Sequence, residues 1–292
     1  MTPPLIHTEG RVLAAIDRST YTESVARHAG WAAARLGAPL ELLHVLDRHP
    51  ETAPVADYSG SLELGEQERL LGELAQLDER RSALAQAQGR LLLKEAEGFA
   101  ADLGVTDAEA RQRYGGLVDT LTEQEPGVRL FVLGKRGEHA DFAKGHLGGH
   151  LERVVRAVHR PLLVVSRAFR PIRRVLVAFD GSATTRKGIG MIAASPLFRG
   201  LEIRVLMVDE DGETPRSQLH WANDVLAGAG FEVAALLRDG QPDSATADAV
   251  REEGIDLLVM GAYGHSRIRQ LIVGSTTTTL LRTCQVPVLL LR

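Results

Sequence analysis

The chain is short of cysteine and of long apolar runs, and each shortage excludes a class of protein. Its one cysteine, Cys284, cannot close an internal disulfide, which excludes a disulfide-stapled secreted domain and fits a reducing compartment. No apolar run approaches the roughly 20 residues that a membrane-spanning helix needs. The first ten residues lack the charged and apolar regions of a signal peptide. We therefore expect a cytoplasmic protein without a membrane partner.

An excess of positive charge is also missing. The chain has 34 Lys and Arg residues against 38 Asp and Glu residues, a formal net charge of -4, which argues against nucleic acid as the main partner. Hydrophobic residues, in contrast, make up 44% of the 292 residues. That is enough for the cores of one large domain or two domains of ordinary size.

Three segments occur twice in the chain, in the same order each time. The pairs are residues 11–19 and 174–182, residues 128–137 and 255–264, and residues 159–165 and 286–291. The first pair reads RVLAAIDRS against RVLVAFDGS. Internal repetition at domain length indicates a duplicated domain. We therefore predict two domains, residues 1–168 and 171–292, with the seam near residues 166–171.

Apolar runs alternate with helical stretches in the second copy. Strands are predicted near residues 173–179, 202–208, 232–237, 255–260 and 286–291, and helices over residues 184–194, 217–229, 244–253 and 275–284. Apolar strands joined by helices predict an α/β fold with a parallel sheet covered on both faces. Ligands of such sheets bind at the carboxyl edge, where the winding direction reverses.

The first copy is longer because of an insertion at about residues 48–104. Residues 50–65 contain proline, serine and glycine and are predicted to form a loop. Strong helix formers follow up to Leu103, and leucines recur there every seven residues, at positions 70, 77, 84 and 91, with Leu74 in a second row. Either this row is a coiled-coil seam or the helix covers its own sheet. We favour the second interpretation.

A glycine motif follows a strand-like apolar run near the C-terminus. It reads Gly261-x2-Gly264-x9-Gly274-Ser275 and leads into four threonines. Glycines at a strand end permit positive φ and a close approach of the backbone to a ligand. The helix behind them offers unpaired N–H groups and the positive end of its dipole to an anion. The pattern predicts a phosphate-binding loop, with Asp180 facing the same crevice.

On these motifs the second half resembles a universal stress protein domain, and the first half resembles the same domain with a helical insertion. The whole chain is therefore similar to a tandem universal stress protein. The resemblance implies two Rossmann-like domains of the adenine nucleotide alpha hydrolase-like type, related by a pseudo-two-fold. Each would have a five-stranded parallel sheet in the order 3-2-1-4-5. It also implies binding of ATP, with or without Mg²⁺, or of AMP or ADP, and a role as a stress-response regulator or sensor.

The resemblance implies which residues contact the nucleotide. They are Asp180, Val208, Gly261, Gly264, Gly274, Ser275 and Thr276. The aspartate would lie beside the adenosine, and the valine would contact adenine through its backbone. The first two glycines would border the ribose and the phosphates. The last three residues would hold the phosphates through N–H groups and hydroxyls.

The first half departs from this pattern. Its equivalent residues are Asp17, Val45, Gly134, Gly137 and Gly148. Ten residues separate the last two glycines, where the second half has nine, and a glycine replaces the serine that follows. The extra residue shifts the backbone N–H groups, and the lost hydroxyl removes a donor to phosphate. We therefore expect ATP mainly in the C-terminal half.

Charged and histidine residues near the first-half loop have simpler explanations than ligand binding. Lys135 and Arg136 are predicted to be solvated loop charges rather than phosphate ligands. His139, His146 and His150 lack a cysteine or carboxylate at ligand spacing, so we predict no metal site there.

No catalytic residue is predicted. The chain lacks the Gly-x-Ser-x-Gly nucleophile elbow and the Walker pattern. Cys284 lies on the apolar final helix and is predicted to be a buried structural thiol. We expect a protein that is not an enzyme, in which slow ATP hydrolysis would be incidental. The alternative is a scaffold that binds no nucleotide and contacts partners through the helical insertion.

The apolar strands that begin at Pro161 and Pro287 need partners, because an exposed edge of this kind aggregates. The resemblance implies that related dimers pair these strands across a two-fold axis, so we expect the two strands to pair within this chain. A homodimer through the inserted helix and an unidentified protein partner are further expectations.

Overall fold

The computed structural model describes residues 8–46, 64–137, 149–261 and 275–291. In the helix that begins at residue 64, side chains are described from residue 69. The first half contains β1 (Arg11–Ala15), α1 (Thr22–Leu36), β2 (Leu40–Leu46), α2 (Leu64–Ala101), β3 (Glu109–Tyr114), α3 (Leu117–Gln124), β4 (Val128–Gly134), α4 (Gly149–Ala157) and β5 (Leu162–Val165). The second half contains β6 (Arg174–Ala178), α5 (Ala183–Ala194), β7 (Glu202–Val208), α6 (Glu213–Gly228), β8 (Val233–Arg238), α7 (Pro242–Glu252), β9 (Leu257–Gly261), α8 (Ser275–Thr283) and β10 (Val288–Leu291). Short 3-10 turns lie at Glu125–Gly127 and Pro196–Phe198.

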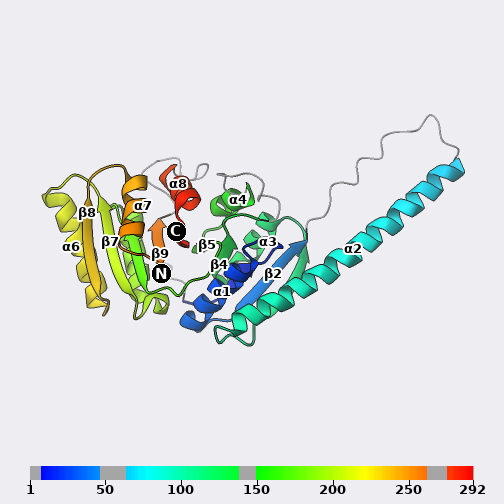
Figure 1. The fold of residues 1–292 in the computed structure, drawn as a ribbon, viewed down its shortest axis with the longest axis horizontal. Coiled ribbons are helices and arrows are strands. Elements are labelled where there is room, and N and C mark those ends of the chain that lie inside the picture. The colour runs from blue at the N-terminus through cyan, green and yellow to red at the C-terminus, as the bar shows by residue number, and fades with distance from the viewer. Residues whose placement is uncertain (1–7, 47–63, 138–148, 262–274, 292) are drawn as a thin grey trace.

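The described strands form one ten-stranded sheet, in the order β3-β2-β1-β4-β5-β10-β9-β6-β7-β8. Each half contributes five parallel strands in the order 3-2-1-4-5, and helices cover both faces (Figure 1). β5 and β10 join the halves as an antiparallel pair, with Val164 beside Val288 and Leu162 beside Leu290. The α/β fold class and the pseudo-two-fold arrangement of Rossmann-like halves are therefore confirmed.

The central strand pair explains why the two most apolar strands of the chain can be buried. β5 reads LLVV and β10 reads VLLL, and every residue of both strands is buried. Such runs are typical of strands covered on both faces. Because these strands pair with each other, neither is an edge of the sheet, as the sequence led us to expect.

The predicted helices of the second half are confirmed, with one shifted start. α6 begins at Glu213, four residues before the predicted Ser217. Pro215 lies in its first turn, where a missing N–H costs nothing and the fixed φ suits a helix. The helix therefore extends one turn further toward the N-terminus than predicted.

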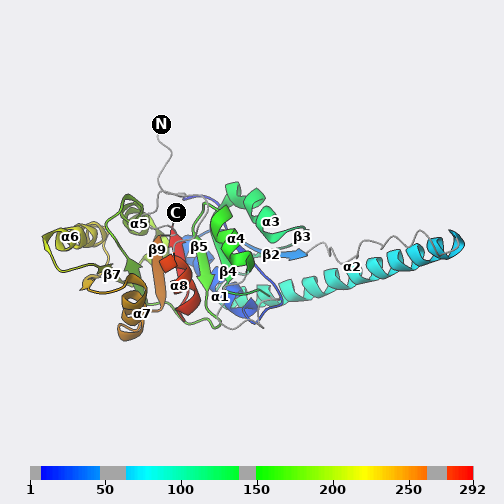
Figure 2. The ribbon, with the colours of Figure 1, turned by 90° about the horizontal axis from the view of Figure 1, so that it is seen from above.

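The inserted helix α2 covers its sheet only with its last third. Leu93, Ala96 and Ala100 are buried in the core, and a Cβ on Gly89 would lie 2.7 Å from His44 Cδ2, so the helix packs tightly on β2 there. Its 38 residues span about 57 Å at about 1.5 Å each, whereas the seven residues of β2 span about 23 Å at about 3.3 Å each. The first part therefore projects past the sheet, as Figures 1 and 2 show. The prediction that the helix covers its own sheet is wrong for this part.

Within residues 8–46, 64–137, 149–261 and 275–291, no helix is long and apolar enough to span a bilayer.

Candidate functional site

The strand register of the second half brings three predicted residues to one edge of the sheet. Ala178 is paired with Leu206, so Asp180 and Val208 leave their strands at the same level. Val177 is paired with Val259, which places Gly261 level with Phe179, next to Asp180. This is the carboxyl edge between β6, β7 and β9, where ligands of open α/β sheets bind.

The Asp180 carboxylate is held by its own loop. Its Oδ1 accepts hydrogen bonds from the Ser182 N–H at 3.0 Å and from Thr185 Oγ1 at 2.6 Å. The Ser182 hydroxyl accepts a bond from the Thr185 N–H at 3.3 Å and caps α5. Asp180 is nevertheless exposed to solvent. The loop thus fixes an exposed carboxylate beside the crevice, an arrangement that can accept hydrogen bonds from ligand hydroxyls.

Gln218 and Arg186, which were not predicted from the sequence, contact this loop at Gly181. Gly181 has φ of +72°, and a Cβ at this position would overlap the Gln218 side chain of α6. Arg186 donates from Nε to the Gly181 carbonyl at 3.0 Å, while its guanidinium carbon lies 4.4 Å from the centre of the Trp221 ring. Sequence spacing gives no signal for Gln218, because α6 is brought to the loop by the fold.

The phosphate end of the predicted site is described only at α8. Ser275 is exposed and Thr276 is half-buried in the first turn of this helix, whereas Thr277 is buried. Gly264 and Gly274 lie outside the described residues. The described part of the predicted loop is therefore the strand end and the helix start, which offers N–H groups and hydroxyls to an anion.

The first half brings its own predicted residues together. Pairing of Ala15 with Leu43 places Asp17 level with Val45. A Cβ on Gly137 would lie 3.1 Å from Asp17 Oδ2, so the backbone here runs close to the carboxylate. Gly148 lies outside the described residues.

Tyr21 makes the first-half crevice differ from the second. A Cβ on Gly134 would lie 2.8 Å from the Tyr21 Cβ, and the tyrosine is buried there. When the two Asp-led loops are aligned, Thr184 occupies the equivalent position in the second half. The bulkier residue lies over the glycine that matches Gly261. This difference between Tyr21 and Thr184 is visible when the two repeats are aligned in the sequence.

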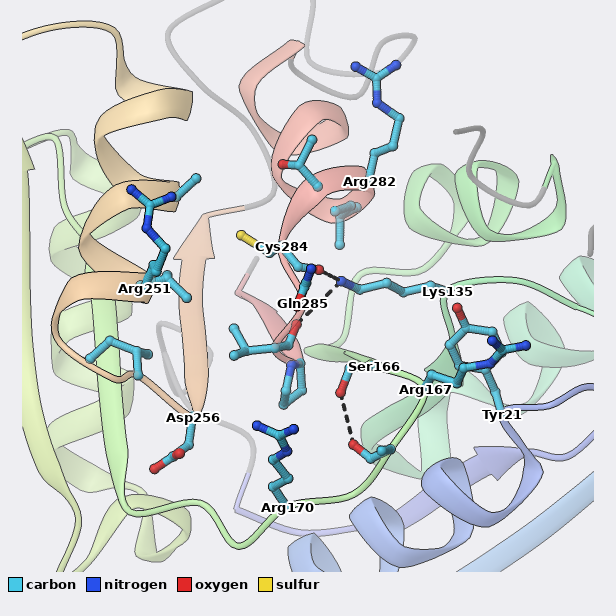
Figure 3. Close-up of a pocket in the computed structure, with 18 of the residues that line it drawn as sticks. Tyr21, Lys135, Ser166, Arg167, Arg170, Arg251, Asp256, Arg282, Cys284 and Gln285 are labelled. Atoms are coloured by element: carbon cyan, nitrogen blue, oxygen red, sulfur yellow. Dashed lines mark hydrogen bonds between the residues drawn. The ribbon is translucent and has the colours of Figure 1, made fainter. Parts of the chain in front are cut away.

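A cleft of about 800 Å³ lies between the two halves, away from the predicted nucleotide residues of the second half. Figure 3 shows it beside the connection from α8 to β10. Its charged lining is mostly cationic and comprises Lys135, Arg136, Arg167, Arg170, Arg251 and Arg282, with Asp256 as the acidic member. This excess of positive charge stands out in a chain with a net charge of -4.

Lys135 is not the solvated loop charge that was predicted. Its side chain is 7% exposed, and its Nζ donates to the backbone carbonyl of Cys284 and, at 3.4 Å, to that of Val286 (Figure 3). Burial lowers the pKa of Lys135 to about 8. Lys135 thus links the two halves, because it directly follows β4 of the first half and its Nζ bonds the loop between α8 and β10 of the second.

The predicted burial of Cys284 is confirmed. Its thiol is buried, and burial raises its pKa, an effect that nearby Lys135 opposes. Among the residues that the structure describes, no group of three His, Cys, Asp or Glu side chains is placed to hold a metal. His150 contacts Arg153 at 3.5 Å, and His139 and His146 lie outside the described residues.

Known proteins are similar to this chain over most of its length. A sequence profile of the universal stress protein family matches residues 9–166 and 213–292. The universal stress protein Slr1230 of Synechocystis is 35% identical over 284 residues, which cover 96% of this chain and 99% of that protein. The structure of a universal stress protein from Archaeoglobus fulgidus aligns with 99% of this chain and 98% of its own, with a TM-score of 0.68 and 19% identity. The functionally unknown protein PA1789 of Pseudomonas aeruginosa aligns over 97% and 93%, with a TM-score of 0.63 and 18% identity.

Proposed function

Because this chain belongs to the universal stress protein family, we propose that it binds an adenine nucleotide, foremost ATP, in the C-terminal crevice and uses the bound state to regulate a stress response. The family membership rests on the profile match and on a relative that is 35% identical over 96% of this chain. The binding role is our inference from the site of this chain.

The observation that carries the proposal is the loop-held Asp180 carboxylate at the edge where β6, β7 and β9 end. A fixed, exposed carboxylate suits the hydroxyls of a ribose, since it accepts hydrogen bonds without further ordering. Val208 leaves the neighbouring strand at the same level, so its backbone is available to the edge of a base.

The start of α8 suits the phosphates. Its first N–H groups have no partner within the helix, and the positive end of the dipole attracts an anion. The hydroxyls of Ser275 and Thr276 lie in the same turn. ATP would supply the negative charge, and Mg²⁺ would enter bound to its phosphates. AMP and ADP would share the adenosine contacts and forgo part of the phosphate contacts.

We propose binding rather than turnover as the primary activity. Regulation would then be a population shift, in which nucleotide stabilises the conformation of the crevice that it binds and a protein partner reads the adjacent surface. Hydrolysis, where it occurs, would be slow and incidental to this role.

The repeated fold supplies a matched pair of variants for the test. We expect Asp180→Asn to weaken ATP binding about tenfold or more in isothermal titration calorimetry, because it removes a charged hydrogen-bond acceptor from the adenosine end. Asp17→Asn changes the equivalent carboxylate of the first half and should leave the C-terminal binding event unchanged.

Two results would count against the proposal. If Asp180→Asn binds ATP as the unaltered chain does, the crevice is misassigned. If the unaltered chain binds no adenine nucleotide with or without Mg²⁺, the non-nucleotide scaffold becomes the better account.

A further inference from the structure

The projecting part of α2 carries an apolar face that nothing covers in the described chain. Its large hydrophobic residues are between 42% and 59% exposed, and they are Leu70, Leu71, Leu74, Leu77 and Leu84. In Figures 1 and 2 this part of the helix runs beyond the sheet and away from both halves. A continuous leucine face on a helix with so few tertiary contacts indicates a surface that binds another chain.

We propose that this face binds the same face of a second copy of the chain, with the two α2 helices antiparallel. Leu70, Leu74 and Leu77 are separated by four and then three residues, and Leu84 continues the seven-residue row. Alternating steps of four and three place these side chains along one seam of the helix, the pattern of a two-stranded coiled coil. The occupant that supplies an equal seam is a second α2.

The charges beside the seam favour the antiparallel orientation. In a parallel pair, Glu73 would face Asp78 of the partner subunit, and like charges would meet twice. In an antiparallel pair, Glu73 faces Arg80 of the partner subunit, and by symmetry Arg80 faces the partner's Glu73. Within its own chain Glu73 lies 3.9 Å from Arg69, but both side chains are largely exposed, so this pair is weak.

The same alignment sets the register of the leucines. Leu74 of each helix lies against the partner's Leu77 at the centre of the pair. Leu70 lies against the partner's Arg81, whose aliphatic stem can cover it while the guanidinium reaches water. The helical seam is thus closed without a buried unpaired charge.

The overlap in this register uses the part of α2 that precedes Gly89. The first residue of one α2 lies opposite residue 87 of the other. Gly89, two residues further on, is where α2 packs on its own sheet against His44.

Leu91 provides an internal control for the orientation. It belongs to the same seven-residue row and is 70% exposed, yet it lies beyond the antiparallel overlap. In a parallel pair it would instead face the partner's Leu91. Its substitution therefore distinguishes the two arrangements.

The mass of the full chain in solution tests the proposal. Sedimentation velocity should give twice the 31.6 kDa chain mass for the unaltered protein. Leu74→Glu with Leu77→Glu should raise the dimer dissociation constant by about 100-fold or more, since four leucines lose their cover. Leu91→Glu should leave the dissociation constant unchanged. Glutamate is a good helix former, and circular dichroism should confirm that helix content is kept.

Charge reversal tests the register. Arg80→Glu should weaken the dimer because Glu73 then meets a glutamate at both ends, and adding Glu73→Arg should restore it. A monomeric unaltered chain would overturn the proposal. So would dissociation caused by Leu91→Glu, or failure of the doubly reversed variant to recover the dimer.

Discussion

Lys135 of the first half donates its buried ammonium to the backbone carbonyl of Cys284 in the second half. The bond lies beside the antiparallel pair of β5 and β10, so the two halves are joined by a side chain as well as by a sheet. Its cost is the removal of a positive charge from water, which lowers the pKa of Lys135 to about 8.

We expect the stability of the chain to depend on this lysine at alkaline pH. Its pKa is about 10.5 when unfolded and about 8 when folded, so the unfolded state binds more protons between these values. The free energy of unfolding should therefore rise as the pH increases from about 8 to about 10.5, because the buried side chain loses its charge. The gain is at most about 3 kcal/mol, from about 1.4 kcal/mol for each pKa unit.

Urea unfolding of the unaltered chain and of Lys135→Met at pH 7 and pH 10 measures this effect. The free energy of unfolding of the unaltered chain should rise relative to that of the variant as the pH increases. Parallel pH dependences of the two proteins would show that Lys135 titrates normally.

Gly181 should be intolerant of a side chain. Its φ of +72° disfavours any residue with a Cβ, and that Cβ would also meet Gln218. We expect Gly181→Ala to destabilise the chain by about 1–2 kcal/mol or more in thermal unfolding and to weaken ATP binding, because the Asp180 loop must move.

Gly190 is the matched control for this substitution. It lies within α5, and a Cβ there would meet nothing within 4 Å. Gly190→Ala should therefore stabilise the helix by about 0.5–1 kcal/mol. An equal effect of both substitutions would contradict the assignment of strain to Gly181.

A tyrosine at position 184, equivalent to Tyr21 of the first half, should obstruct nucleotide binding in the C-terminal crevice. In Thr184→Tyr, the ring would lie over Gly261 as Tyr21 lies over Gly134. We expect a loss of ATP affinity of about tenfold or more, because the ring occupies the space beside the strand end. Thr184→Ser should bind like the unaltered chain in the same titration. Equal affinities of the tyrosine and serine variants would show that this space is not used.

The sequence predicted the features that depend on local pattern and on repetition. The alternation of apolar runs and helices predicted parallel strands covered by helices in each half. The apolar strands after Pro161 and Pro287 predicted that each needs a partner, and the family resemblance implied that they pair with each other. The carboxyl-edge positions of Asp180 and Gly261 also followed from the strand pattern. These features rest on periodicity and strand order, which the sequence carries directly.

Other features depend on contacts between residues that are far apart in the sequence, and these were not predicted. The burial of Lys135 arises because β4 ends against the last loop of the other half. Gln218 reaches Gly181 only because α6 folds back over the loop. The projection of α2 follows from its length relative to the sheet, and the leucine spacing alone did not decide between its two interpretations. No local pattern encodes these distances.

The central claim is that the C-terminal crevice holds an adenine nucleotide, and the nucleotide content of the purified chain tests it most directly. Freshly purified protein would be denatured and the released nucleotide identified and quantified per chain by mass spectrometry, with Asp180→Asn prepared in parallel. We predict about one ATP per chain, because only the C-terminal half carries the complete nucleotide motif. The Asp180→Asn variant should contain little or none. No nucleotide in the unaltered chain, together with no binding of added Mg-ATP, would contradict the account.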